Sequence, residues 1–132
     1  MKVVDTTFLI DLLRGEAGAV EKAGELDEEG GAATTAVNVF ELSYGVHRGV
    51  KDVERRLEEV KRVVSNLRVF PLDQKAAMRS AEIAGTLDRE GRGIDPFDAL
   101  IAGIVMAEGA ECVVTKNVSH FERIPGLKVE EH

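Results

Sequence analysis

Short apolar runs rich in β-branched residues alternate along this chain with longer segments of helical spacing. The first run, residues 2–4, ends at Asp5, and the apolar residues after it recur at spacings of three and four until Gly15. That spacing is typical of an amphipathic helix, so a strand passes directly into a helix at Asp5. Strands and helices that alternate through such short connections indicate a parallel sheet covered by helices on both faces.

The alternation continues to the end of the chain without a repeat or a linker that would divide it. Strands are predicted at residues 2–4, 32–35, 68–72, 112–115 and 127–130. Helices are predicted over residues 8–13, 19–26, 37–49, 51–67, 74–90 and from Pro96 onward. Pro71 confines the third strand to a sheet edge or to a strand end. We therefore predict an α/β fold: a three-layer α/β/α sandwich with a central, mainly parallel sheet of four to five strands, in a single domain spanning residues 1–132.

Side-chain spacing predicts which helix faces pack together. Four residues share one side of the helix over residues 37–49: Val37, Phe40, Tyr44 and His47. The inner face of the helix over residues 74–90 is predicted to comprise Ala77, Ala81, Ala84 and Leu87. The helix that begins at Pro96 is apolar nearly all round, so we expect it to be the most buried one.

The charge and cysteine content exclude several classes of protein. The chain has 17 Lys and Arg against 24 Asp and Glu, a net charge of −7, which argues against binding nucleic acid through a general positive field. A nucleic-acid substrate is still allowed, because divalent cations bound to carboxylates invert the local sign of the charge. The single cysteine, Cys112, is expected in the core, and one cysteine can form neither a disulfide nor a Cys-based metal site within the chain.

The hydropathy pattern predicts no contact with a membrane. The N-terminal segment has an acid at position 5 and lacks the basic and apolar regions of a signal peptide. The longest uncharged apolar stretch, residues 99–107, is far shorter than the roughly 20 residues of a membrane span. We therefore expect a cytoplasmic protein.

Polar side chains follow several of the predicted strands where the chain leaves the sheet at its carboxyl edge. Asp5 ends the first strand, Glu41 lies early in the helix after the second, and Asp98 lies near the start of the helix that begins at Pro96. Asn117 follows the fourth strand. Glu41 stands among apolar neighbours, so it is expected to be half-buried and to need a partner. Three carboxylates that share one cleft repel one another unless a cation lies between them, and oxygen ligands suit Mg²⁺ or Mn²⁺.

Each polar residue also has a structural explanation. Asp98 in the first helical turn can complement the helix dipole, and Asp95 before a proline fits an N-cap as well as an additional metal ligand. Asp11 is expected to be solvated or paired with Arg14 three residues on. His120 belongs to no recognisable metal-binding spacing, so a core or surface role is expected for it.

Three segments resemble motifs of the PIN domain family and, within it, of the VapC-type toxins of toxin–antitoxin systems. VVDTTFLIDLLRGE resembles the first family motif with Asp5 in the acidic position, and TTAVNVFELSYGV resembles the second with Glu41. GIDPFDALIAGIVMAEGAECVVTKNVSHFERIPGLKVE is similar to the third and fourth, with Asp98 in the acidic position. The resemblance implies that these three acids bind metal and carry catalysis. The family often has an aspartate where this chain has Asn117, whose carbonyl oxygen can still bind a metal ion or orient a water.

The resemblance also implies a function and partners. It implies a ribonuclease dependent on Mg²⁺ or Mn²⁺ that cleaves an RNA substrate, is silenced by a VapB-like antitoxin and forms a homodimer or a higher homo-oligomer. Thr6 and Thr115 match small hydroxyl positions that can hydrogen-bond the metal ligands. Arg14, Arg48 and Lys116 lie near the carboxyl-edge segments and are either phosphate contacts or ordinary solvated basic residues.

Two questions stay open at the level of sequence. The apolar stripes over residues 20–26 and 53–67 either pair with an antitoxin helix or a second subunit, or pack against the chain's own sheet. The rival function is a catalytically weak PIN-fold protein that acts mainly as a protein- or RNA-binding module, a hypothesis motivated by Asn117 and the acidic net charge. The joint presence of Asp5, Glu41 and Asp98 favours the nuclease, because a scaffold has no physical reason to keep three like charges in one cleft.

Overall fold

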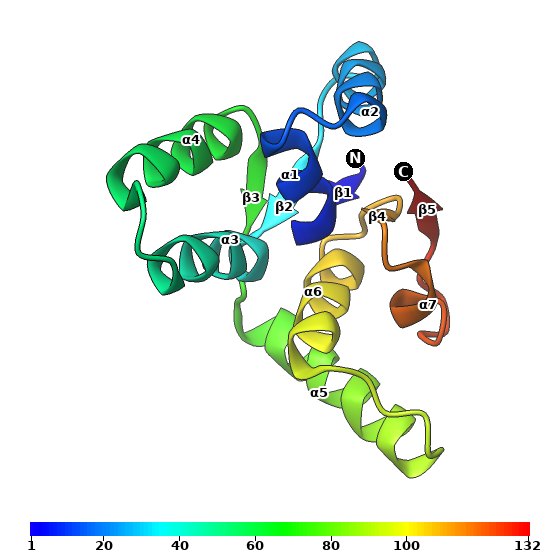
Figure 1. Cartoon of the computed structure of the whole chain (residues 1–132). Coiled ribbons are helices and arrows are strands. Elements are labelled where there is room, and N and C mark those ends of the chain that lie inside the picture. Colours follow the sequence, from blue (N-terminus) through cyan, green and yellow to red (C-terminus); the bar gives the residue numbers. More distant parts are fainter.

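The computed structural model describes residues 1–132 and contains a five-stranded parallel sheet in the order β3-β2-β1-β4-β5 (Figure 1). The strands are β1 (Val3–Val4), β2 (Ala33–Thr35), β3 (Arg68–Phe70), β4 (Val113–Thr115) and β5 (Val129–Glu131). The predicted fold class is confirmed. The expectation from Pro71 is also confirmed, because β3 is an edge strand.

Helices connect the strands and cover the sheet. They are α1 (Thr6–Leu13), α2 (Ala17–Glu28), α3 (Ala36–Arg48), α4 (Val53–Ser65), α5 (Gln74–Arg89), α6 (Pro96–Ala107) and α7 (Val118–Phe121). Successive strand residues point to opposite faces, so Val3 joins a core with α5, α6 and α7, while Val4 joins a second core with α1, α2 and α4. None of these helices is both long enough and apolar enough to span a bilayer.

The strand order places a topological switch point beside β1. From β1 the chain builds the sheet outward through β2 and β3, and then returns to add β4 and β5 on the other side of β1. Ligands of open α/β sheets bind in the crevice at the carboxyl ends of the strands at such a point. Asp5 follows β1 directly and Asn117 lies two residues after β4, so both lie at this crevice.

The buried face of α5 agrees with the prediction at Leu87 and differs from it by one position in the earlier turns of the helix. Ala77 and Ala81, which were expected to face inward, are exposed. The buried side chains of α5 are Ala76, Ser80, Ile83 and Leu87. Alanines occur around much of this helix, so their spacing alone cannot distinguish the side that faces the core.

Close packing between α5 and α6 explains the observed face. Gly103 of α6 is buried against α5, and a Cβ placed on it would lie 2.8 Å from the carbonyl oxygen of Ala76 and 2.8 Å from the backbone nitrogen of Ser80. The absence of a side chain at Gly103 therefore sets the distance between the two helices.

Gly103→Ala should lower the free energy of unfolding by about 1–3 kcal/mol, because the added methyl group forces these packed helices apart. Gly85→Ala in α5 is the matched control, since the nearest atom to its Cβ would be a side-chain nitrogen of Arg89 at 3.7 Å. We expect this control to leave stability unchanged or to raise it by roughly 0.5–1 kcal/mol. Urea denaturation followed by circular dichroism measures both variants, and wild-type stability of Gly103→Ala would contradict this packing.

Candidate active site

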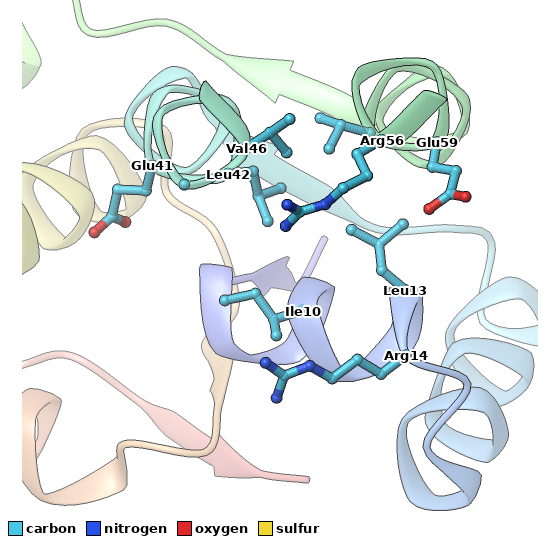
Figure 2. Close-up of a pocket in the computed structure, with 10 residues that line it drawn as sticks. Ile10, Leu13, Arg14, Glu41, Leu42, Val46, Arg56 and Glu59 are labelled. Atoms are coloured by element: carbon cyan, nitrogen blue, oxygen red, sulfur yellow. The ribbon is translucent and has the colours of Figure 1, made fainter. Parts of the chain in front are cut away.

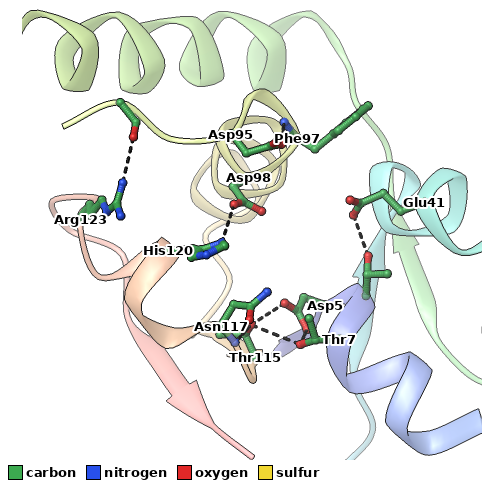
Figure 3. Close-up of polar contacts among 12 residues, drawn as sticks. Asp5, Thr7, Glu41, Asp95, Phe97, Asp98, Thr115, Asn117, His120 and Arg123 are labelled. Atoms are coloured by element: carbon green, nitrogen blue, oxygen red, sulfur yellow. Dashed lines mark hydrogen bonds and ion pairs between the residues drawn. The ribbon is translucent and has the colours of Figure 1, made fainter. Parts of the chain in front are cut away.

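Three carboxylates from separate segments face a common space at the carboxyl edge of β1 (Figure 3). Asp5 comes from the turn between β1 and α1, Glu41 from α3, and Asp98 from the first turn of α6. Their charges interact, because those of Asp98 and Asp5 both contribute to the raised pKa of Glu41. The structure thus brings together the three acids that the sequence singled out.

Asp5 is a buried carboxylate whose two oxygens both accept hydrogen bonds. It is 4% exposed and is the N-cap of α1, where its Oδ1 accepts from the backbone N–H of Phe8 at 3.1 Å. The hydroxyls of Thr7 and Thr115 donate to Oδ1 at 2.7 Å and to Oδ2 at 2.5 Å. Burial raises the pKa of Asp5, and these donors oppose the rise by stabilising the charged form.

Backbone N–H groups set the direction of both threonine hydrogen bonds to Asp5. The N–H of Lys116 donates to the hydroxyl oxygen of Thr7 at 3.0 Å, and the N–H of Asn117 donates to that of Thr115 at 2.9 Å. A backbone N–H can only donate, so each hydroxyl accepts there and turns its single proton toward the carboxylate. Both hydroxyl protons therefore point at the Asp5 carboxylate and favour its ionised form against the effect of burial.

Glu41 is half-buried and has one oxygen engaged within the chain. The hydroxyl of Thr6 donates to its Oε1 at 2.7 Å, which agrees with the sequence expectation of a partner for this residue. Oε2 makes no hydrogen bond or ion pair with the chain. Burial is the main reason that the pKa of Glu41 is raised, and the charges of Asp98, Asp5 and Asp95 raise it further.

Asp98 lies against a histidine that the sequence analysis did not place in the site. The Nδ1 of His120 lies 3.2 Å from Oδ2 of Asp98, and their side chains are 48% and 18% exposed. Burial raises the pKa of Asp98, and His120 opposes that rise. His120 belongs to α7, which follows β4, so tertiary folding brings it to α6 without any sequence spacing that could have revealed it.

Two further predicted residues lie at the margin of the space. Asp95 is exposed and caps α6, accepting from the backbone N–H of Phe97 at 2.8 Å, so the N-cap prediction is confirmed. Asn117 is exposed at the start of α7, and its side chain makes no hydrogen bond within the chain. Its backbone N–H reaches Asp5 through the hydroxyl of Thr115 (Figure 3).

The carboxylates share a space without forming a closed cluster. No group of three His, Cys, Asp or Glu side chains is arranged so that it could hold a metal ion as it stands. The pKa values of Asp5, Glu41 and Asp98 are nevertheless all raised, mainly by burial, so each carries an unfavourable charge that a cation would offset. Carboxylate oxygens are also the donors that Mg²⁺ and Mn²⁺ prefer, so the donor set fits such an ion.

The PIN domain family model matches residues 2–127. The chain belongs to the PIN domain family. It is 32% identical to the tRNA(fMet)-specific endonuclease VapC of Shigella flexneri, over 98% of this chain and 96% of that protein. The structure of VapBC2 from Rickettsia felis bound to a promoter DNA fragment matches with a TM-score of 0.89 and 25% identity, over 99% of this chain and 98% of that one. The structure of DNA-bound VapBC from Salmonella typhimurium matches with a TM-score of 0.88 and 30% identity, over 98% of this chain and 96% of that one.

One predicted phosphate contact of this PIN domain, Lys116, forms an ion pair. Its Nζ lies 2.8 Å from Oδ2 of Asp11, which is buried although its sequence context suggested solvent or a pairing with Arg14. That expectation was wrong because the turn after β4 lies against α1. This ion pair holds a partly exposed lysine at the edge of the sheet where the acids gather.

Two arginines line a groove that reaches Glu41 (Figure 2). Arg14 was a predicted phosphate contact, whereas Arg56 of α4 was missed, because a basic residue on a densely charged helix gives no distinguishing signal. The groove runs between α1, α3 and α4, and its lining comprises Ile10, Leu13, Arg14, Glu41, Leu42, Gly45, Val46, Arg56, Glu59 and Val60.

The side of α3 that was predicted to pack against the rest of the protein is mostly exposed. Phe40 and Tyr44 are 52% and 53% exposed, and only Val37 of the predicted set is buried. The buried side chains of α3 are Val37, Asn38, Leu42 and Val46. Phe40 stacks on Tyr44 and on Phe97, with ring centroids 5.7 Å apart in each pair. Arg48, the remaining predicted phosphate contact, places its guanidinium 5.6 Å from the centre of the Tyr44 ring.

The raised pKa of Glu41 predicts how its neutral variant behaves without metal. A raised pKa means that the folded protein binds the carboxyl proton of Glu41 more tightly than the unfolded chain does, so the ionised side chain destabilises the fold. Glu41→Gln, which cannot ionise, should therefore raise the free energy of unfolding at pH 7 in EDTA. The gain should be complete above the raised pKa and should vanish below the ordinary glutamate value of 4.5, where both folded and unfolded wild-type chains are protonated.

Urea denaturation in EDTA at pH 7 and at pH 4 tests this expectation. The exposed Glu108→Gln at the end of α6 is the control for the loss of one negative charge and should change stability little. If Glu41→Gln is no more stable than the wild type at pH 7, burial and the neighbouring acids do not destabilise the ionised carboxylate of Glu41.

Proposed function

We propose that this PIN domain is an endoribonuclease dependent on Mg²⁺ or Mn²⁺ and the toxin of a type II toxin–antitoxin (VapBC) system. The observation that carries the proposal is the meeting of Asp5, Glu41 and Asp98 at the switch point of the sheet, each with a pKa raised by burial. The full-length similarity to a VapC endonuclease supports the reaction class.

The three acids would hold the metal, with Asn117 and Asp95 as further oxygen donors at the margin. When bound, such an ion lowers the pKa of a water molecule and offsets the charge that develops on the phosphate. The chain's own residues would orient the ligands: Thr7 and Thr115 donate to Asp5 and favour its ionised form, and His120 contacts Asp98. Both arrangements limit side-chain motion before an ion arrives.

Three basic side chains would contact the RNA backbone. Arg14 and Arg56 line the groove that reaches Glu41, and Lys116 is held near the carboxyl edge by Asp11. Such contacts position the RNA without reading its sequence, and they place positive charge locally on a chain whose net charge is −7.

Asp98→Asn should reduce Mg²⁺- or Mn²⁺-dependent RNA cleavage by about 100-fold or more, because it removes a ligand charge worth several kcal/mol to the transition state. The exposed control Glu108→Gln should cleave RNA like the wild type. EDTA should abolish cleavage by the wild type and by this control. Initiator tRNA is a suitable first substrate, since the Shigella flexneri relative is named as specific for tRNA(fMet). Cleavage that survives EDTA or Asp98→Asn would exclude this mechanism, and metal binding without any cleavage would favour a binding module.

A VapB-like antitoxin is the proposed protein partner, since the similar solved structures are VapBC complexes. The apolar stripe of α4 is largely covered by the chain itself, because Val60 is buried and its neighbours pack against the core of α1 and α2. On α2, by contrast, Val20 is 51% exposed. A second pocket, of about 130 Å³, lies between α1, α2 and α4 and is lined mainly by apolar residues, so it has room for one apolar side chain of an antitoxin helix docked on this surface.

A second copy of this chain is the proposed occupant of the exposed apolar surface beside the acids. We call it the aromatic surface; it comprises Ala36, Val37, Phe40, Leu72, Phe97 and Leu100. It contains no charged side chain, so it offers a polyanion no electrostatic attraction, and two copies can bury it against each other through a two-fold axis. This placement would bring two sets of acids close to one interface.

Leu72→Asp should therefore convert a homodimer into a monomer, because it buries an unpaired charge in the interface. Leu72 is 40% exposed, so the substitution should leave the monomer folded. Val50→Asp is the matched control, because Val50 is 92% exposed and lies in the connection after α3, outside the aromatic surface. Size-exclusion chromatography with light scattering at micromolar concentrations measures both. A monomeric wild type, or a dimeric Leu72→Asp, would contradict the assignment.

A further inference from the structure

Asn38 is a fully buried amide that connects α3 to the start of α1. It is 0% exposed, and its side chain contacts two threonines. The hydroxyl of Thr35 donates to its Oδ1 at 2.7 Å, and its Nδ2 donates to the hydroxyl oxygen of Thr6 at 2.9 Å. Thr6 in turn donates to Oε1 of Glu41 at 2.7 Å. A continuous chain of hydrogen bonds therefore ends on a candidate metal ligand.

A backbone N–H sets the direction of this chain. The N–H of Asn38 donates to the hydroxyl oxygen of Thr35 at 3.2 Å, so Thr35 must direct its one proton to Oδ1 of Asn38. That contact leaves Nδ2 of Asn38 facing Thr6, where it can only donate. Thr6 then accepts from Asn38 and has a single direction left for its proton, toward Glu41.

The capping of α3 does not require the Asn38 side chain. Thr35 caps the helix through the backbone N–H at position 38, which any residue except proline supplies. A buried amide costs desolvation that an apolar side chain of similar size would not. An apolar residue could replace neither the hydrogen bond from Thr35 nor the one to Thr6, and of these two the bond to Thr6 leads on to Glu41.

We propose that Asn38 is a positioning residue of the metal site, which makes Thr6 donate to Oε1 of Glu41 and so leaves Oε2 free for the cation. The inference rests on the proposed function, in which Glu41 binds the metal. Residues that orient metal ligands typically affect affinity by about 10- to 100-fold, so losing this one should be measurable.

Isothermal titration with Mn²⁺ tests the role on the full chain without RNA. Asn38→Leu, which is similar in size and lacks the amide, should bind Mn²⁺ about tenfold more weakly than wild type. Thr6→Val should show a comparable loss, because it removes the hydroxyl that ends the chain of hydrogen bonds. Combining the two should cause no further loss, since both remove the same interaction.

Thr34→Val is the matched control for the loss of a buried hydrogen bond. Thr34 is 0% exposed and donates to the carbonyl oxygen of Val4 at 2.9 Å, with no contact to the acids. It should destabilise the protein while leaving the Mn²⁺ affinity unchanged. Wild-type affinity of Asn38→Leu, or losses that add in the double variant, would overturn the positioning role.

Nuclear magnetic resonance on the wild-type chain gives an independent measurement that needs no folded variant. The side-chain amide signals of Asn38 should shift during a Mg²⁺ titration with the same midpoint as the signals of Thr6, whereas the backbone amide of Thr34 should not. An unresponsive Asn38 amide in a metal-binding protein would overturn this inference alone. A wild-type chain that binds neither Mg²⁺ nor Mn²⁺ would overturn the proposed function together with it.

Discussion

Backbone N–H groups at the carboxyl edge of the sheet control how the acidic site is held. Those of Lys116, Asn117 and Asn38 donate to threonine hydroxyl oxygens. Because a backbone N–H can only donate, each hydroxyl must accept there and direct its own proton to its other partner. The resulting donors converge on Asp5 directly, and on Glu41 through Thr6. These donors thus orient the buried carboxylates and favour their charged forms, which burial disfavours.

The same edge depends on the packing of the two cores. Val3 and Val4 pack on opposite faces of the central strand, so the turn at Asp5 is held from both sides. Gly103 lets α6 approach α5 closely, and α6 begins with the turn that carries Asp98. The stability of these cores offsets the unfavourable burial of the acids, which is why carboxylates with raised pKa values can lie close together in a folded protein.

Much of this arrangement could be predicted from the sequence, and the errors have identifiable physical causes. The positions of Asp5 and Asp98 followed from the residues that begin and end strands and helices, because capping and periodicity are local. The faces of α3 and α5 were assigned wrongly, because Phe40 is stabilised by stacking on Phe97 from another helix, and because alanine spacing carries no information about orientation. The contact of His120 with Asp98 and the ion pair of Asp11 with Lys116 each join segments far apart in the chain, so no local sequence pattern predicts them.

The sequence by itself determined the order of the five strands and the first six helices, the parallel sheet and the placement of three acids at its carboxyl edge, but not the short helix α7, because hydrophobic periodicity and capping act over a few residues. Only the tertiary structure decided which donors each acid receives, which basic residues approach them and which aromatic rings stay exposed. Those outcomes depend on the distance and orientation between elements, and side-chain packing such as that at Gly103 sets both only when the whole chain has folded.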